Sequence, residues 1–415
     1  MKFPIFWLIA QSCISLVSAE SNISNKDSVP KKSDYPHDWC QLISENSGQI
    51  YKNKNNPWID NMAIGGRFHY QMGSVHGDDV RGNSFKNYFE ENRRFRIETE
   101  IGFLTYFDID LGVNLVDDRR FRNSTNRQLQ WGYDTFDSAF LSYNLGKAID
   151  TETFDDIKLH YGRMKFNITE EVHESSNRML TVERSNLADE LGGNNPRPTG
   201  LTMEVVKNDW SGTVGIFSGE DDSAFIGDWN DGKVAYVSLA WQVTKRLLTR
   251  VDHVQNDQSG TDDFLGYAQA TSLSAVYEKK DWGLMVNLMH GDNGGVGNGN
   301  LTPMRQGDFH GAIVMPWYWI IKKRLQCVAR YQYARADEME GLRINNRYIG
   351  ALHNAPSLDL DGGYGDENHS FYLGMNWHIC EDHFKVMGGV SYDKMSARTS
   401  DFTGTTYLLA VRTYF

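Results

Sequence analysis

Arginine and glutamate alternate with apolar residues in one short stretch, and this spacing could build an anion-binding surface. The charged positions are Arg94, Arg96, Glu98 and Glu100, and the intervening ones are Phe95, Ile97, Thr99 and Ile101. In an extended strand, successive side chains point to opposite faces. A guanidinium supplies both positive charge and a planar fork of donors that suits phosphate oxygens. The pattern therefore predicts a strand with one apolar face and one charged face that can compensate an anion leaving water.

The same alternation, extended along the chain, nominates further cations for an inner, polar face. The candidates for lining a pore and binding anions are Arg67, Arg94, Arg96, Arg163, Lys165, Arg184, Arg250 and Arg330. Arg163 and Lys165 share the parity of Leu159 and Tyr161, so a bulge at Gly162, or emergence above the membrane, is required to aim them inward. Arg184 and Arg197 belong to the loop that follows. For each arginine the alternative role is a wall charge paired with a carboxylate.

Carboxylates occupy the same predicted inner face and the same loop. Those on the wall are Glu98, Glu100, Asp108, Asp110, Glu204 and Asp252, and the constriction-loop acids are Glu170, Glu171 and Glu183. Acids on a loop opposite arginines on a wall produce a transverse field that orients polar solutes. If the inner arginines select anions, replacing Arg94 and Arg96 by Gln lowers anion preference.

No arrangement of residues indicates catalysis, a cofactor or a metal. The sequence lacks the Gly-x-Ser-x-Gly, His-Glu-x-x-His, Cys-x-x-Cys and phosphate-loop patterns. The net charge of -12 argues against nucleic acid as a partner. After the predicted signal peptide, Cys40, Cys327 and Cys380 form an odd set without metal spacing. One disulfide is possible, but buried or lipid-facing thiols are favoured.

The elements that must position these charges are strands with period-two alternation. Sixteen are predicted, at about 60–72, 92–104, 105–116, 135–145, 156–166, 199–207, 210–218, 233–243, 246–255, 266–278, 281–290, 308–318, 323–335, 369–379, 384–394 and 405–415. Short and long connections alternate between them, which is the pattern of short periplasmic turns and long extracellular loops. The sequence predicts an all-β fold, a 16-stranded antiparallel transmembrane β-barrel.

The N-terminal segment, the last strand and the positions of the tryptophans support this prediction. Residues 1–19 resemble a signal peptide ending in Val17-Ser18-Ala19, residues 20–58 form a polar periplasmic lead-in expected to be weakly ordered, and 59–415 form the barrel. The segment ending at Phe415 resembles the C-terminal strand of bacterial outer-membrane barrels. Six tryptophans fall at the short-turn ends of strands, as one interfacial belt requires, namely Trp210, Trp241, Trp282, Trp317, Trp319 and Trp377.

A family resemblance becomes specific around the fifth strand. Tyr161-Gly-Arg-Met-Lys165, Ser175-Ser176, Thr181-Val-Glu-Arg-Ser185 and Gly200-Leu201 are similar to motifs of the phosphate-selective porin O and P family, although Phe166-Asn167 stands where the family usually has Pro-Phe. The resemblance implies a homotrimer whose third loop, with a short helix at 177–191, folds inward and narrows the lumen. It also implies that arginines and lysines near the constriction select phosphate.

The favoured function is an outer-membrane porin for passive diffusion of small hydrophilic solutes, with phosphate or other anions as preferred solutes and outer-membrane lipid as surroundings. The first alternative is a non-selective or cation-preferring general porin, consistent with the acidity of the chain. A structural or adhesive barrel and a barrel hydrolase are further alternatives. A sixteen-stranded barrel is wide enough to leave an aqueous channel, which argues against the structural reading.

Overall fold

The computed structural model describes residues 40–41, 43, 48–116, 131–192, 196–219, 225–227, 229, 232–257, 264–294, 307–349, 359–360 and 363–415. The predicted signal peptide and residues 20–39 of the lead-in lie outside these ranges. The strands are β1 (Gln49–Lys52), β2 (Ile59–Asp78), β3 (Ser84–Phe103), β4 (Phe107–Val116), β5 (Trp131–Asn144), β6 (Asp156–Arg163), β7 (Thr199–Lys207), β8 (Trp210–Ser218), β9 (Lys233–Thr244), β10 (Leu247–Asn256), β11 (Gln269–Lys279), β12 (Trp282–Asp292), β13 (Asp308–Ile321), β14 (Leu325–Ala336), β15 (Leu342–Arg343), β16 (Tyr364–Gly365), β17 (Glu367–Cys380), β18 (Phe384–Ser396) and β19 (Asp401–Tyr414). Short helices among the described residues include α2 (Leu145–Ala148), α3 (Glu170–His173) and α4 (Asn186–Leu191). Within the described ranges, no helix has the length and apolar character needed to cross a membrane.

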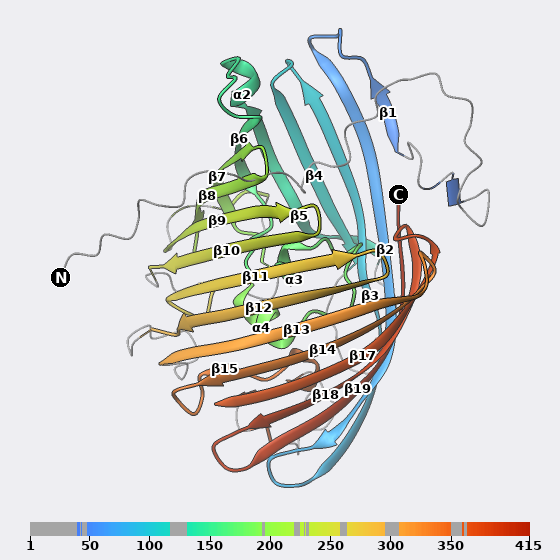
Figure 1. Cartoon of the computed structure of the whole chain (residues 1–415), viewed down its shortest axis with the longest axis vertical. Coiled ribbons are helices and arrows are strands. Elements are labelled where there is room, and N and C mark those ends of the chain that lie inside the picture. Colours follow the sequence, from blue (N-terminus) through green and yellow to red (C-terminus); the bar gives the residue numbers. More distant parts are fainter. Residues whose placement is uncertain are drawn as a thin grey trace, which may run out of the picture.

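The strands close into an antiparallel barrel (Figure 1). The main sheet has 17 described strands, of which β1 is a short addition, and the remaining sixteen follow one another around the wall. Closure is made by β19 and β2, whose register runs from Thr403 opposite Asp78 to Tyr414 opposite Arg67. This arrangement confirms the predicted sixteen-stranded antiparallel barrel.

The alternation of side chains separates an outer apolar face from an inner polar face. On β17, Phe371, Leu373 and Trp377 are 51%, 61% and 58% exposed, whereas Ser370 and Asn376, at the alternate positions, are buried. Exposed side chains of this kind belong against lipid in a membrane barrel. The tryptophan belt is smaller than predicted, because Trp317 is buried, with the inner-face parity of Ile313 and Met315, and its ring lies over Gly283.

Two strands extend well beyond the predicted membrane-crossing length. β2 and β3 each have 20 residues and pair as far as Asp78 opposite Ser84, so most of the predicted long loop at 73–91 is a β-hairpin. The hairpin turn is closed by Asp79, whose carboxylate accepts hydrogen bonds from the backbone N–H groups of Arg81 (2.9 Å) and Asn83 (2.7 Å). An Asp that bonds to the following backbone is a common turn device.

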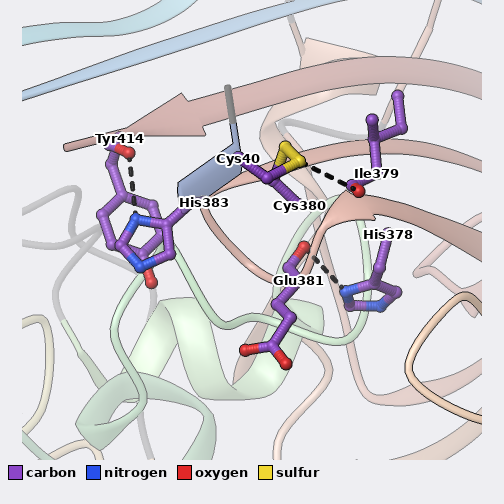
Figure 2. Close-up of a disulfide and its surroundings, with 7 residues drawn as sticks. All are labelled: Cys40, His378, Ile379, Cys380, Glu381, His383 and Tyr414. Atoms are coloured by element: carbon purple, nitrogen blue, oxygen red, sulfur yellow. Dashed lines mark hydrogen bonds between the residues drawn. A yellow bond between two sulfur atoms is a disulfide. The ribbon is translucent and has the colours of Figure 1, made fainter. Parts of the chain in front are cut away.

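The N-terminal segment is attached to the barrel at two places, which corrects two predictions. Cys40 and Cys380 form a disulfide, with the Cα atoms 5.2 Å apart, so the preference for free thiols was wrong for this pair (Figure 2). Cys327 is free and half-buried. β1 pairs with β2 through Lys52 opposite Asn61, so this part of the lead-in is ordered. Both attachments lie at the end of the barrel where β17 ends and β2 begins.

The turn that carries Cys380 also contacts the end of β19. His383 donates from Nδ1 to the Tyr414 carbonyl at 3.2 Å, and the two rings stack with centroids 4.3 Å apart (Figure 2). The Tyr414 N–H donates to the His383 carbonyl at 3.0 Å. The disulfide thus ties the N-terminal segment to the turn that supports the closing strand.

Candidate functional site

The segment between β6 and β7 is held to the barrel wall by ion pairs with its own carboxylates. Glu170 accepts from Arg250 on β10 at 2.9 Å, and Glu171 accepts from Arg330 on β14 at 2.8 Å. His173 lies 2.9 Å from Asp252 on β10. Two of the predicted constriction-loop acids therefore meet two of the predicted pore-lining arginines. Because these charges are paired with Glu170 and Glu171, Arg250 and Arg330 hold the segment against the barrel wall.

Backbone carbonyls of the same segment accept hydrogen bonds from inward side chains of the wall. Lys385 on β18 donates to the Met179 carbonyl at 3.2 Å, and Asn376 on β17 donates to the Leu180 carbonyl at 2.8 Å. Arg412 on β19 donates to the carbonyls of Ser176, at 3.1 Å, and Val182. A helix uses its carbonyls internally. This competition explains why the predicted helix at 177–191 is reduced to α4 at Asn186–Leu191.

Helix α4 begins and packs in a way that fits its sequence. The Ser185 side chain caps its N-terminus by accepting from the Ala188 N–H at 3.3 Å. Leu187 and Leu191 are buried, and the Leu191 carbonyl accepts from the Tyr267 hydroxyl at 2.6 Å. The segment is therefore packed on its apolar side as well as bonded on its polar side, over the wall from β10 to β19.

On the opposite side, the segment and the wall of β2, β3 and β5 enclose a cavity of about 240 Å³. We call it the cationic cavity. The described residues that line it are Arg67, Arg94, Arg96, Asp137, Lys165, Asn167, His173, Ser175, Ser176, Arg184 and Arg197. Six of these carry positive charge, whereas Asp137 is the one carboxylate among them. Five of the six were predicted as anion-binding candidates, and the sixth, Arg197, was placed by the sequence only in the loop.

The single carboxylate is shared between two of the arginines. Asp137 Oδ1 lies 2.7 Å from Arg96 Nη2 and 2.7 Å from Arg197 Nη2. Arg96 also donates from Nε to Asn114 at 2.6 Å. Arg67 pairs with Glu98 and donates to the Ser176 hydroxyl at 3.1 Å. These contacts hold the guanidinium groups in fixed orientations around the cavity.

Arg94 differs from its neighbours because it has no counterpart. It is 5% exposed, and among the described residues no carboxylate lies within salt-bridge distance of it. Its Nη1 is buried without a hydrogen-bond partner. Buried polar groups are nearly always satisfied, so an unpaired guanidinium that lines a cavity indicates a place for an anion or ordered water.

The positively charged loop residues that line the cavity also repel one another electrostatically. Burial, together with the positive charges of Arg184 and Arg197, holds the pKa of Lys165 well below its usual range. Burial is also the main cause that lowers the pKa of Arg184. Crowded cations in a desolvated site favour an anion, which relieves both effects.

The third constriction-loop acid lies outside the cavity, in a network that sequence reasoning missed. Glu183 accepts from Arg93 at 3.1 Å and from Gln71 at 2.7 Å, and it pairs with Arg347. In an uninterrupted strand, Arg93 would share the outer-face parity of Phe95 and Ile97. The register shifts between His69 and Tyr70, opposite Arg94 and Asn92, and this bulge turns Arg93 inward. Nothing in the local sequence signals it.

Arg163 is turned inward by backbone geometry at the glycine before it. Gly162 has a φ of +134°, which is open to glycine, and a Cβ there would lie 2.3 Å from the Ala139 carbonyl oxygen. Arg163 is 4% exposed and donates from Nε to the Phe136 carbonyl at 2.8 Å. It supports the wall beside the cationic cavity and is absent from the described lining.

Comparison with known proteins agrees with the fold. Residues 62–246 match the family model described as phosphate-selective porin O and P. Among curated protein sequences, none matches significantly. The outer membrane channel DcaP of Acinetobacter baumannii has a similar structure, with a TM-score of 0.54 at 11% identity, covering 86% of this chain and 97% of that chain.

Two further solved structures are similar over the same extent. The trimer form of OmpT, an outer membrane protein of Vibrio cholerae, gives a TM-score of 0.52 at 11% identity, covering 86% of this chain and 99% of that chain. OprB of Pseudomonas putida gives 0.51 at 12% identity, covering 85% and 94%. At such identity the likeness concerns the fold. The chain therefore has the fold of outer-membrane channel barrels, and its residues 62–246 match the phosphate-selective porin O and P family.

Proposed function

We propose that this porin passes small anions, phosphate among them, in preference to cations, and that the segment between β6 and β7 narrows its lumen. The supporting observation is the cationic cavity, where six positive side chains face one carboxylate. An anion that leaves water there finds fixed charge and oriented donors. Passage requires binding weak enough to allow release. Asp137, which already occupies Arg96 and Arg197, supplies that competition.

The remaining features of the proposal come from the sequence and the relatives. Residues 1–19 act as a signal peptide for export, and the barrel sits in outer-membrane lipid with its long connections outside the cell and its short turns at the periplasm. The assembly is a homotrimer, a state in which OmpT of Vibrio cholerae has been solved. The lead-in from residue 20 to 58 lies on the periplasmic side, where β1 and Cys40 attach it.

The test is the zero-current potential of the purified protein in a planar bilayer across a KCl gradient, repeated with phosphate. We expect an anion-selective potential and block of chloride current by phosphate. The double variant Arg94→Gln, Arg96→Gln should reduce both the anion selectivity and the phosphate block. Arg335→Gln, an exposed arginine on β14, is the matched control and should change neither. Wild-type protein with no anion selectivity refutes the proposal.

A general or cation-preferring porin is the second candidate, and one observation favours it. Glu98, Glu100, Asp108 and Asp110 share the inner face with the arginines and lie nearer the β3–β4 turn. Cation selectivity without phosphate block would establish this alternative. An identical zero-current potential in wild type and in the double arginine variant would also exclude the cationic cavity as the determinant of ion selectivity.

A further inference from the structure

The inner wall below the cationic cavity carries the opposite charge. Along β3, the inward positions change from Arg94 and Arg96 to Glu98 and Glu100 within two residues, a step of about 7 Å along a strand. Asp108 and Asp110 occupy the neighbouring inner positions on β4, and Glu204 lies on β7. We call these five carboxylates the acidic zone. It lies toward the short turns, hence toward the periplasm.

Strand register brings these carboxylates together on one patch of wall. Glu100 lies directly opposite Asp110, and Asp108 is opposite Gly102, one inner row nearer the β3–β4 turn. Like charges placed opposite each other across strands are unfavourable unless water or counter-ions separate them. Glu100, Asp108 and Asp110 remain partly exposed, which is the condition for hydration by an open lumen.

Basic groups offset this zone only in part. Lys158 lies opposite Glu204 and 3.3 Å from Asp156, and His160 Nε2 is 3.7 Å from Glu204. Glu98 is the member at the boundary, where it pairs with Arg67 of the cationic cavity. Glu100, Asp108 and Asp110 have no ion pair with a described residue, although Asn61 donates to Glu100 at 3.1 Å and Ser138 donates to Asp110.

We propose that the lumen is a bipolar ion path that rectifies current, with the cationic cavity on the extracellular side and the acidic zone on the periplasmic side. The proposal rests on ions passing through the cationic cavity, as the proposed function states. It adds a direction, which anion preference alone does not supply.

The direction follows from which ions each zone admits. When the extracellular side is negative, anions enter the cationic cavity first and cations enter the acidic zone first. Both accumulate at the boundary near Arg67 and Glu98, so current is high. With the opposite polarity, anions must first cross the acidic zone and cations must first cross the cationic cavity. Both ions are then depleted at the boundary, and current is low.

The experiment is the current–voltage curve of single channels at ±100 mV in symmetrical KCl. In 0.1 M KCl the Debye length is about 10 Å, comparable with the size of each zone, and we expect a current ratio of roughly 2. At 1 M the Debye length is about 3 Å, and the ratio should approach 1. This salt series uses the unchanged protein, so it does not depend on any variant folding.

Phosphate marks the orientation of each channel. From the extracellular side it reaches the cationic cavity without crossing the acidic zone, so it should block at lower concentration from that side. We expect the larger current when the phosphate-sensitive side is negative. The larger current with that side positive overturns the proposal.

Variants separate the two zones. The triple exchange Glu100→Gln, Asp108→Asn and Asp110→Asn should abolish rectification while retaining anion preference, whereas Glu367→Gln, on the outer face of β17, should leave the ratio unchanged. Each single exchange should lower the ratio partially, which covers a triple variant that fails to fold. A wild-type channel that is anion-selective but ohmic overturns rectification and leaves the proposed function intact. A rectifying channel without anion preference overturns the proposed function and leaves rectification intact.

Discussion

The two sides of the lumen use the same residue types in different ways. On the side from β10 to β19, Arg250, Arg330 and Arg412 each meet a carboxylate or carbonyl of the segment between β6 and β7. We call this the clamp side. On the side of β2, β3 and β5, six cations surround the cationic cavity with one carboxylate among them. The clamp side positions the segment, and the cavity side, in the proposed function, presents charge to solutes.

The difference shows that an inward arginine has no fixed role. Its role depends on what the facing segment offers, because a buried guanidinium must find either a protein acceptor or a solute. Glu170 and Glu171 satisfy Arg250 and Arg330, whereas Arg94 has no such counterpart. Four measurements test this contrast.

The largest effect is expected from Glu171→Gln on the clamp side. The Arg330–Glu171 pair is buried, with side chains only 6% and 4% exposed, and removing one partner of such a pair destabilises by roughly 3–5 kcal/mol. We expect the segment to detach in part, which raises single-channel conductance and noise. Glu174→Gln, which breaks the exposed pair with Arg178, is the control and should leave both unchanged. Unchanged conductance in Glu171→Gln means that the ion pair is dispensable for the clamp.

The next effect concerns the rim of the clamp side, where Cys40 is bonded to Cys380. Cys40→Ser should lower the free energy of unfolding by roughly 2–4 kcal/mol, because the disulfide links positions 340 residues apart. The heating temperature at which the barrel loses its compact migration in a detergent gel measures the change. Cys327→Ser should not shift that temperature. Equal temperatures for wild type and Cys40→Ser would mean that the disulfide does not contribute to the stability of the barrel.

On the cavity side, Asp137→Asn should strengthen phosphate block. Two attractive contacts of Arg96 and Arg197 are then released for the solute. A gain of roughly tenfold, about 1.4 kcal/mol, lies well within the ~4 kcal/mol of a charge pair at 4 Å with an effective dielectric of 20. The concentration of phosphate that halves chloride current measures it. Weaker block would mean that Asp137 mainly orients the arginines.

The smallest effect is a pH dependence at Lys165. Burial and the charges of Arg184 and Arg197 lower its pKa well below 10.5, the value of an ordinary lysine. Lys165 therefore loses its charge at lower pH than an exposed lysine does. Anion preference should therefore fall as the pH rises, at lower pH than that at which exposed lysines titrate. Lys165→Gln should have a flatter profile, whereas Lys147→Gln, in α2, should match wild type. Parallel profiles for wild type and Lys165→Gln would exclude Lys165 as the titrating group.

Much of the cavity could be predicted because strand parity is local. The period-two pattern correctly placed Arg67, Arg94 and Arg96 on one inner face, since a pleated strand has no other way to direct alternate side chains. Arg93 was missed because a bulge depends on the partner strand, and the helix at 177–191 was overextended because wall side chains take its carbonyls. The disulfide was missed because Cys40 and Cys380 meet only when the barrel closes.

Alternation and connection length are enough to predict the antiparallel strands, their order, their apolar outer face and the charges available inside, because these are properties of neighbouring residues. Which of those charges neutralise each other depends on the closed barrel. Arg330 and Arg94 have the same parity signal, yet Glu171 reaches one and no described carboxylate reaches the other. Pairing between distant segments depends on where the closed barrel places them, and Coulomb energy falls with a distance that a linear sequence does not contain.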